Sequence, residues 1–370
     1  MTIFKISIIV LANLIWSAEN QAWAVGGTNP SGQTMDLHRL TIYQGEQLIN
    51  EGLILTGPSG LYGILENHGN IMWSGTTSCR EGQIINGEDG TIVFSNYIDC
   101  YGRDPHPGNF LSFYYNEEPS LIDNAGTFLV DEAIDGEYGY WTAWFRGEII
   151  NRPTGKFLVR RNNWQGNLVM GTSSVAPRIE NSGYFEIGSE SIWDIDGDSS
   201  DYAAGGEYVQ DGGELHVDGI FGAKSLAIRK GKISGSGTVQ GYFTGYAIRN
   251  VTFSPGSPVG TLTINPYDSS SIKSPTTCFR CVVDIELSDE NTYDQLDVAG
   301  VFIMRHPTYN ISLREGYSTA AGDRFTILSA DGIKHTGLSP VYNLPELTDG
   351  KTWQVDVTNS EVILTVVAPQ

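Results

Sequence analysis

The chain has 370 residues, of which 44 are glycine, and its formal net charge is −21 at pH 7. This charge makes nucleic acid and anionic membranes poor partners, because both require a basic protein surface, and we expect no nucleic-acid partner. The glycine content and the scarcity of helix-favouring stretches predict an all-β protein with almost no helix.

Residues 1–24 have the three parts of a secretory signal peptide. Lys5 precedes an apolar run from Ile6 to Trp16, and the small residues Ala22 and Ala24 precede the cleavage expected after Ala24. The apolar run is too short to span a membrane as a helix. We therefore expect a mature protein that is secreted or held at the cell surface and has no transmembrane segment.

One phrase recurs between residues 65 and 239: an apolar residue, a spacer, Asn or Asp, then Gly and two alternating apolar residues. A clear copy is Ile179-Glu-Asn181-Ser-Gly183-Tyr-Phe185-Glu-Ile187. The glycines of the successive copies are Gly69, Gly90, Gly126, Gly155, Gly183, Gly213 and Gly237. This irregular period of 20–36 residues is typical of a protein whose repeats stack on one another to bury an apolar face.

Each copy of the phrase predicts a strand, a corner and a second strand. The period-two alternation of Phe185 and Ile187 puts both side chains on one face of a strand. Asn181 and Gly183 supply residues that tolerate the positive φ of a tight corner. Asparagines that recur at the corner can also stack as a ladder of side-chain amides.

Such units can pair as hairpins of an antiparallel sandwich or wind as coils of a parallel β-helix. Asn86-Gly87 is the one clear two-residue hairpin signal. The repeat length also exceeds the strand spacing of sandwiches. We therefore predict an all-β fold, a right-handed parallel β-helix of irregular 20–36-residue coils over residues 25–265, followed by a C-terminal β-solenoid or cap region over residues 266–370.

Three further phrases follow one another near the C-terminus. They are Ser254-Pro-Gly-Ser-Pro-Val-Gly-Thr-Leu-Thr-Ile264, Tyr293-Asp-Gln-Leu-Asp-Val-Ala-Gly300 and Gly322-Asp-Arg-Phe-Thr-Ile-Leu328. Over about residues 231–367 this order resembles the C-terminal part of bacterial autotransporter passenger domains and related secreted surface β-solenoids. The resemblance implies the architecture but no single activity, because that family carries adhesins, proteases and inert stalks. The family's export barrel is not expected, since the chain stops at Gln370.

All four cysteines follow residue 24, where an oxidising compartment permits disulfides. Cys79 and Cys100 are 21 residues apart, as are two of the repeat glycines, which predicts equivalent places on adjacent coils and a disulfide between them. Cys278 and Cys281 are then expected to pair locally. Sequence alone leaves three connectivities open.

The densest acidic cluster predicts a calcium site that consists of Asp194, Asp196, Asp198, Asp201 and Glu207. The spacing from Asp196 to Glu207 matches a calcium loop, but Asp201 stands where that loop requires glycine. A solvated acidic loop is the alternative interpretation. No other cofactor is expected.

An aromatic segment contains Tyr138, Tyr140, Trp141 and Trp144 beside several carboxylates. Ring faces can stack on the C–H surfaces of a sugar while carboxylates accept hydrogen bonds from its hydroxyl groups. The segment therefore predicts a sugar-binding platform. The alternative is an insertion that folds back and buries its own rings.

No nucleophile, metalloprotease or phosphate-loop motif is present in the sequence, and we assign no catalytic residue. The expected function is that of an exported, non-catalytic surface or extracellular protein with an adhesive or structural role. Glycans or host cell-surface molecules are the expected partners. The alternative is a carbohydrate-active β-helix protein that binds or cleaves polysaccharides.

Overall fold

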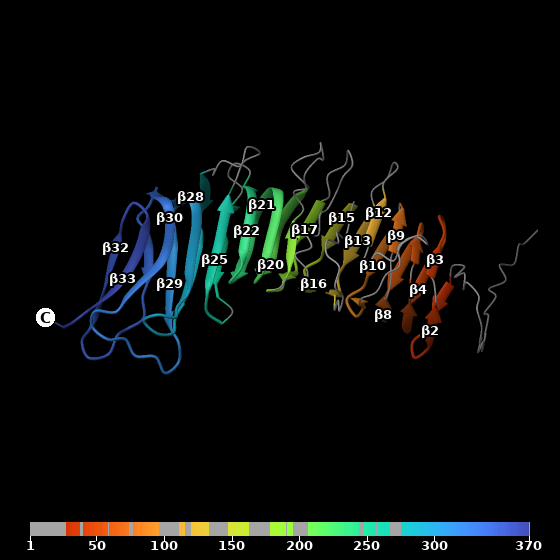
Figure 1. The fold of residues 1–370 in the computed structure, drawn as a ribbon, viewed down its shortest axis with the longest axis horizontal. Helices are drawn as coiled ribbons and strands as arrows, with labels where there is room; N and C mark the ends of the chain where they lie inside the picture. Colours follow the sequence, from red (N-terminus) through yellow and green to blue (C-terminus); the bar gives the residue numbers. More distant parts are fainter. Residues whose placement is uncertain are drawn as a thin grey trace, which may run out of the picture.

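The computed structural model describes residues 27–37, 40–57, 59–73, 77–80, 82–95, 111–114, 120–132, 147–162, 178–189, 191–194, 206–243, 248–256, 258–266 and 275–369. Within these ranges the chain forms strands and turns and contains no helix, so the predicted all-β class is confirmed. The strands lie side by side along an elongated molecule (Figure 1). Most of them belong to one sheet of 29 strands, which is mainly parallel.

Two parallel ladders run along this sheet. The first contains β1 (Gly27–Asn29), β4 (Gln47–Asn50), β7 (Ile64–Asn67), β10 (Gln83–Asn86), β13 (Ser120–Asn124), β15 (Gly147–Asn151), β17 (Arg178–Asn181) and the start of β20 (Glu207–Val217). The second contains β2 (Thr34–Leu37), β5 (Leu53–Thr56), β8 (Asn70–Trp73), β11 (Thr91–Ser95), β14 (Thr127–Glu132), β16 (Lys156–Asn162), β18 (Tyr184–Ile187), the end of β20, the end of β21 (Ile220–Gly235), β24 (Val251–Pro255), β27 (Val282–Leu287), β29 (Thr308–Leu313) and β31 (Val341–Asn343).

The other strands follow the same parallel pattern until the C-terminal end. A separate sheet contains β3 (Leu40–Ile42), β6 (Ser59–Leu61), β9 (Thr77–Arg80) and β12 (Leu111–Tyr114). The main sheet also contains β19 (Ile192–Asp194), β22 (Thr238–Phe243), β23 (Ile248–Arg249), β25 (Thr261–Pro266), β26 (Thr276–Phe279), β28 (Gln295–Arg305), β30 (Arg324–Thr336), β32 (Thr352–Val357) and β33 (Glu361–Val367). The last pairings, β30 with β33 and β33 with β32, are antiparallel and end the parallel stack.

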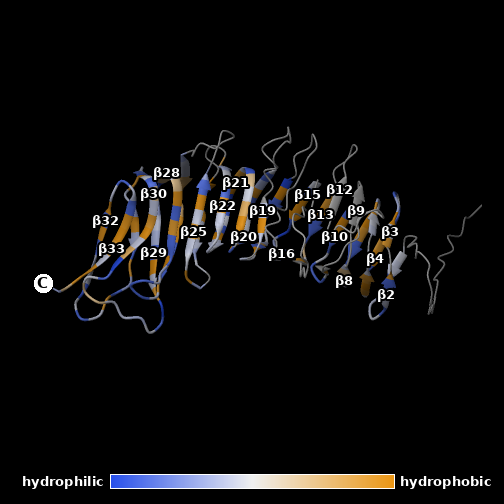
Figure 2. Ribbon diagram, in the orientation of Figure 1, coloured by the Kyte–Doolittle hydropathy of each residue, from blue (hydrophilic) through white to orange (hydrophobic). Residues whose placement is uncertain are grey.

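The alternation in the sequence decides which side chains form the core. Figure 2 shows hydrophobic and hydrophilic residues alternating along many of the strands. In the second ladder Phe128, Phe157 and Phe185 are buried on successive strands. Their rings stack at centroid distances of 4.8 and 5.0 Å. In-register pairing thus places like residues over like residues in one continuous core.

The predicted amide ladder is confirmed in the first ladder of strands. Its members are Asn29, Asn50, Asn67, Asn86, Asn124, Asn151 and Asn181, all buried. The Nδ2 of each of the first six donates to the Oδ1 of the next asparagine at 2.7–2.8 Å. The same Nδ2 groups also donate to a backbone carbonyl in the second ladder. Asn151 Nδ2, for example, donates to the carbonyl of Tyr184 in β18 at 3.0 Å. The buried amides are therefore satisfied by their neighbours.

The copy of the phrase at residues 209–217 has a different register from the one expected. Asn181 is aligned with Gln210, not with Asp211, and the pairing of β20 shifts between Gln210 and Asp211. The longer glutamine side chain is joined to the ladder through Tyr208, whose Oη accepts from Asn181 Nδ2 and donates to Gln210 Oε1, each at 3.2 Å. The corner between Gln210 and Glu214 has one residue more than the corner between Asn181 and Tyr184. The expected alignment of Asp211 with Asn181 was therefore wrong by one residue.

Most of the corner glycines are required because the backbone of the preceding corner lies too close for a side chain. The expected reason was a positive φ. Gly126 and Gly183 have no positive φ. A Cβ at Gly126 would lie 2.2 Å from the carbonyl oxygen of Gly90, and one at Gly183 would lie 2.2 Å from that of Arg152. Successive corners therefore stack so tightly that backbone occupies the space of a side chain.

The local disulfide prediction is confirmed. Cys278 lies near the end of β26, and Cys281 directly precedes β27. A disulfide joins the two cysteines, whose Cα atoms are 6.0 Å apart. Arg280, between them, has a φ of 54°, as a tight turn requires. Both cysteines are buried in the core.

Candidate functional surface

Polar side chains gather on one face of β18, β20 and β21. Along these strands they alternate with buried residues such as Phe185 and Leu215, so they point away from the core. Parallel pairing then sets them in two rows across the strands. The rows are Tyr184–Glu214–Lys232 and Glu186–His216–Ser234.

His216 is the centre of this cluster. Its Nδ1 lies 2.8 Å from Ser234 Oγ and its Nε2 lies 3.1 Å from Asp218 Oδ2. Ser234 Oγ donates to Glu214, whose carboxylate also lies 3.1 Å from Lys232 Nζ. Because carboxylates only accept, the three hydrogen bonds are satisfied together when both imidazole nitrogens carry a proton.

The Ser234, His216 and Asp218 side chains resemble a nucleophile with its base and orienting acid, yet the geometry does not suit that chemistry. A serine nucleophile must be activated by the base and be open to substrate. Ser234 is 3% exposed, and its proton goes to Glu214. The cluster therefore joins neighbouring strands and presents no reactive hydroxyl group.

Ion pairs across the strands flank this cluster. Arg178 lies 3.5 Å from Glu148 and 3.0 Å from Glu207 and also pairs with Glu180. The hydrogen bond from Arg178 to Glu180 raises the pKa of the guanidinium, against the effect of burial. Such exposed pairs contribute about 0–1 kcal/mol each to the stability of the fold, so they stabilise it only slightly.

The predicted calcium site lies mostly outside the described residues. Asp196, Asp198 and Asp201 are not described, and for Asp194 only the backbone, in β19, is described. Glu207 is described, and its carboxylate faces Arg178. Among the side chains that the structure describes, no group of three or more His, Cys, Asp or Glu could hold a metal ion. The calcium site stays a prediction.

Two further predictions also fall outside the described ranges. The aromatic segment with Tyr138, Tyr140, Trp141 and Trp144 is not described. Cys79 lies in β9, but Cys100 is not described, so their pairing stays a prediction.

Asp294 is a buried carboxylate that the sequence analysis did not select. It is 4% exposed, and it accepts backbone N–H groups from Glu286 at 2.8 Å and Gly260 at 3.2 Å. Burial raises the pKa of Asp294 to about 6, although these two hydrogen bonds favour the charged form. Asp294 thus connects the turn before β25 to β27.

Sequence analysis also missed the cluster around His216, although a signal for it exists. Tyr184 and Glu214 each directly follow a repeat glycine, and Glu186 and His216 come two residues later. Alignment on the corner glycines therefore puts these polar residues in the same columns. The hydrogen bonds between them depend on side-chain geometry that no such alignment supplies.

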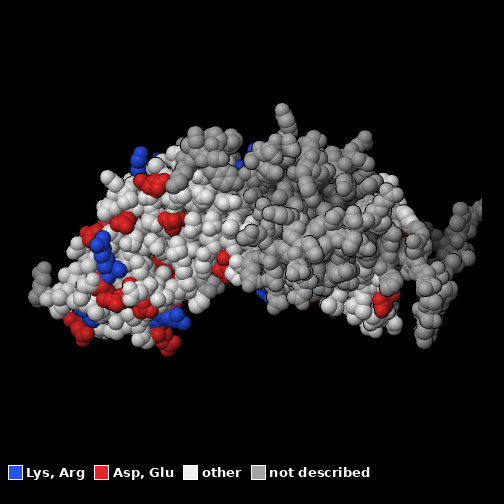
Figure 3. Space-filling view, viewed as in Figure 1, with Lys and Arg blue, Asp and Glu red and all other residues white. Residues whose placement is uncertain are grey.

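Charged side chains near the C-terminal end are dispersed on the face that Figure 3 shows. On the face shown in Figure 3, acidic and basic residues are scattered over the C-terminal strands and form no single large patch. No helix in the described part of the chain is long and apolar enough to cross a membrane. In comparisons with known proteins, no family model and no curated protein matched the sequence.

Proposed function

We propose that the chain winds as a right-handed parallel β-helix and serves as an exported, non-catalytic scaffold with a structural or adhesive role. The observation that carries this proposal is the second ladder, in which thirteen strands from β2 to β31 pair in parallel. Parallel neighbours require a crossover connection, and such connections are right-handed in nearly all proteins.

The side chains support a spacer role. A stack in which each unit contacts only its neighbours gains length without a larger core. The asparagine ladder and the stacked phenylalanines repeat the same contacts from one strand pair to the next. On the outer face, pairs such as Arg152–Asp123 and Arg160–Glu186 again join successive strands. The described polar groups therefore bind mainly to each other.

Two observations favour export. The pattern of residues 1–24 is that of a signal peptide. The disulfide between Cys278 and Cys281 suits an oxidising compartment, because thiols in the cytosol are kept reduced. Secretion or display at the cell surface, with glycans or cell-surface molecules as partners, follows from this proposal and from the resemblance to passenger domains.

The functional test measures binding and turnover on the same polysaccharides. Purified chain is incubated with a panel of insoluble plant, algal and bacterial polysaccharides, with and without calcium. Retained protein and released reducing or unsaturated ends are then quantified. We expect no product above that of heat-denatured protein, whether or not protein is retained. Steady product release that stops on denaturation would overturn the scaffold proposal.

A further inference from the structure

Basic side chains gather along one corner of the stack, at the ends of β23, β26 and β28 and beside them in β21. They are Arg229, Arg249, Arg280, Arg305 and His306. The pairing of β23 and β28 with β26 places Arg249 and Arg305 on either side of Phe279. Arg229 and Arg249 each lie two residues before the pairing of β21 with β24 begins. We refer to these five basic residues as the arginine corner.

Two guanidinium groups of the arginine corner lie against an aromatic ring. The Cζ atoms of Arg280 and Arg305 are 5.4 and 5.9 Å from the centroid of the Phe279 ring, within the range of cation–π attraction. Both side chains are exposed. Neither guanidinium forms an ion pair with a described residue, whereas Arg160 and Arg178 pair with glutamates. Their N–H groups are therefore open to an anion from solution.

The backbone at this corner does not explain the basic residues. Asn250, Arg280 and His306 occupy equivalent places, since each donates its N–H to the residue that ends the next strand. All three have a positive φ, between 49° and 57°, and Gly337 follows at the end of β30 with a φ of 85°. Glycine and asparagine adopt this conformation more readily than arginine or histidine. Backbone outliers of this kind cluster at functional sites.

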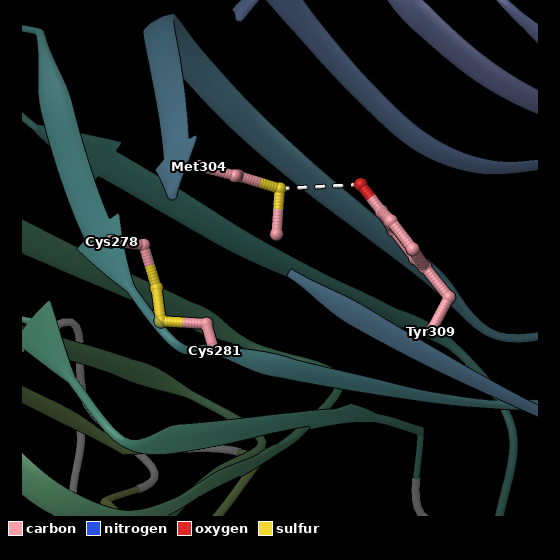
Figure 4. Close-up of a disulfide and its surroundings, with 4 residues drawn as sticks. All are labelled: Cys278, Cys281, Met304 and Tyr309. Atoms are coloured by element: carbon pink, nitrogen blue, oxygen red, sulfur yellow. Dashed lines mark hydrogen bonds between the residues drawn. A yellow bond between two sulfur atoms is a disulfide. The ribbon is translucent and has the colours of Figure 1, made fainter. Parts of the chain in front are cut away.

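The disulfide holds part of the arginine corner in place. Phe279 and Arg280 are the two residues between Cys278 and Cys281, so the bond closes the turn that carries them. Both cysteines are buried, and Figure 4 shows their disulfide beside Met304. A guanidinium on such a fixed turn loses less freedom on binding than one on a mobile loop. The turn is thus organised before a ligand arrives.

We propose that the arginine corner binds the anionic groups of an acidic polysaccharide, either uronate carboxylates or sulfates. A guanidinium binds such oxygen anions through parallel N–H···O hydrogen bonds. His306 Nδ1 accepts from the backbone N–H of Leu338 at 2.8 Å. The Leu338 side chain is 72% exposed and offers apolar surface to the C–H groups of a sugar. This inference names a ligand for the adhesive role proposed above and rests on that role.

A slender polymer suits this corner better than an acidic protein does. The net charge of −21 repels every anionic partner, but charges are screened beyond about 8 Å at physiological ionic strength. A single polysaccharide chain can follow the corner closely. A stable protein interface covers about 800 Å² of each partner and would extend onto acidic side chains such as Asp211, which pairs with Lys230 next to Arg229.

The test measures binding of four soluble polymers to the immobilised full chain with its disulfide intact. The polymers are polygalacturonate, dextran sulfate, neutral dextran and polyglutamate. We expect at least one of the two acidic polysaccharides to bind more tightly than polyglutamate, and neutral dextran not to bind. Comparison of the two separates carboxylate from sulfate as the anion. Binding should weaken as salt is added, because the contacts are ionic.

Two variants remove the guanidinium groups that lie against Phe279. Arg280→Asn and Arg305→Gln should each weaken binding about 10-fold or more, because each removes hydrogen bonds to a charged group. Arg280→Asn introduces the residue that already stands at position 250, so its melting temperature should not fall. Arg324→Gln is the matched control and should bind like wild type. Arg324 is exposed at the opposite end of β30 and forms no ion pair with a described residue.

Three results would overturn the proposal. They are binding of both acidic polysaccharides no tighter than that of neutral dextran, binding of polyglutamate as tight as that of the better polysaccharide, and unchanged binding by both Arg280→Asn and Arg305→Gln. The second result would make an acidic protein the partner. None of the three concerns product release, so the scaffold proposal is tested independently by its own assay.

Discussion

At the residue scale, Asn151 shows how the interior tolerates a polar column. Its Oδ1 accepts from Asn124 at 2.8 Å, and its Nδ2 donates to Asn181 Oδ1 at 2.8 Å and to the carbonyl of Tyr184 at 3.0 Å. The side chain is 1% exposed, so water cannot replace these partners. Each asparagine in the column is thus satisfied only if its neighbours are present.

Replacing Asn151 by alanine should therefore destabilise the protein strongly. The change leaves one N–H of Asn124 without a partner and removes one of the two hydrogen bonds that Asn181 Oδ1 accepts, as well as the hydrogen bond to the Tyr184 carbonyl, which together cost about 2–3 kcal/mol. Denaturant unfolding measures the loss. Asn70→Ala, at an exposed asparagine on β8, is the matched control and should change stability by less than about 0.5 kcal/mol. Equal effects of both changes would show that the ladder contributes nothing.

Asp294 should make stability depend on pH. Its folded-state pKa of about 6 lies above the ordinary value of 3.8, so between these values the folded state holds a proton that the unfolded state has lost. The contribution of Asp294 to stability is therefore greatest below pH 4, falls as pH rises to about 6, and is constant above it.

The difference in unfolding free energy between wild type and Asp294→Asn isolates this effect, because Asn does not titrate. We expect wild type to lose about 2–3 kcal/mol relative to the variant between pH 4 and pH 7. A difference that is constant over this range would show that Asp294 titrates normally in the folded state.

At the scale of the elements, the corner between two strands sets how closely neighbours stack. A Cβ on Gly126 would lie 2.2 and 2.3 Å from the carbonyl oxygens of Gly90 and Gly87. Neither carbonyl can move without disturbing the corner before it. The glycine is therefore required by its neighbour along the stack, not by its own backbone angles.

Gly126→Ala should consequently cost about 3 kcal/mol, at the upper end of the usual cost of overpacking. Gly332→Ala is the matched control, because its Cβ would meet Val301 Cγ2 at an ordinary 3.5 Å and no positive φ is involved. Thermal unfolding of both variants checks the prediction. A melting temperature of Gly126→Ala equal to that of Gly332→Ala would contradict the close approach of the corners.

Most of the strands and corners, and the asparagine ladder, could be predicted from sequence, because the strand–corner–strand phrase repeats both its period-two pattern and its asparagine. The register at Gln210 could not, since one extra residue and the bridging Tyr208 hydroxyl restore the ladder in a way no local pattern reveals. The contacts of the Tyr309 hydroxyl with Met304 and His335 were also hidden. These residues lie on the consecutive strands β28, β29 and β30, and no shared motif in the sequence marks them.

At the scale of the whole molecule, the ladders define an elongated stack that ends in an antiparallel β30–β33–β32 unit (Figure 1). The last strand, β33, presents buried Val362 and Leu364 to the core. Antiparallel pairing at this end covers the final parallel strands, as capping units do in repeat proteins. Stability is then expected to be a sum of contacts between neighbours along the stack.

The central claim is that the second ladder runs in parallel register along the length of the molecule. Spin labels at Met72→Cys in β8 and Asn343→Cys in β31 test it, with Cys79 and Cys100 changed to serine and distances measured by double electron–electron resonance. Both positions are exposed, and they lie in one register column ten strand spacings apart. At about 4.8 Å per spacing, we predict a single distance of roughly 48 Å. A distance below about 30 Å, as in a folded-back antiparallel sandwich, would contradict the account.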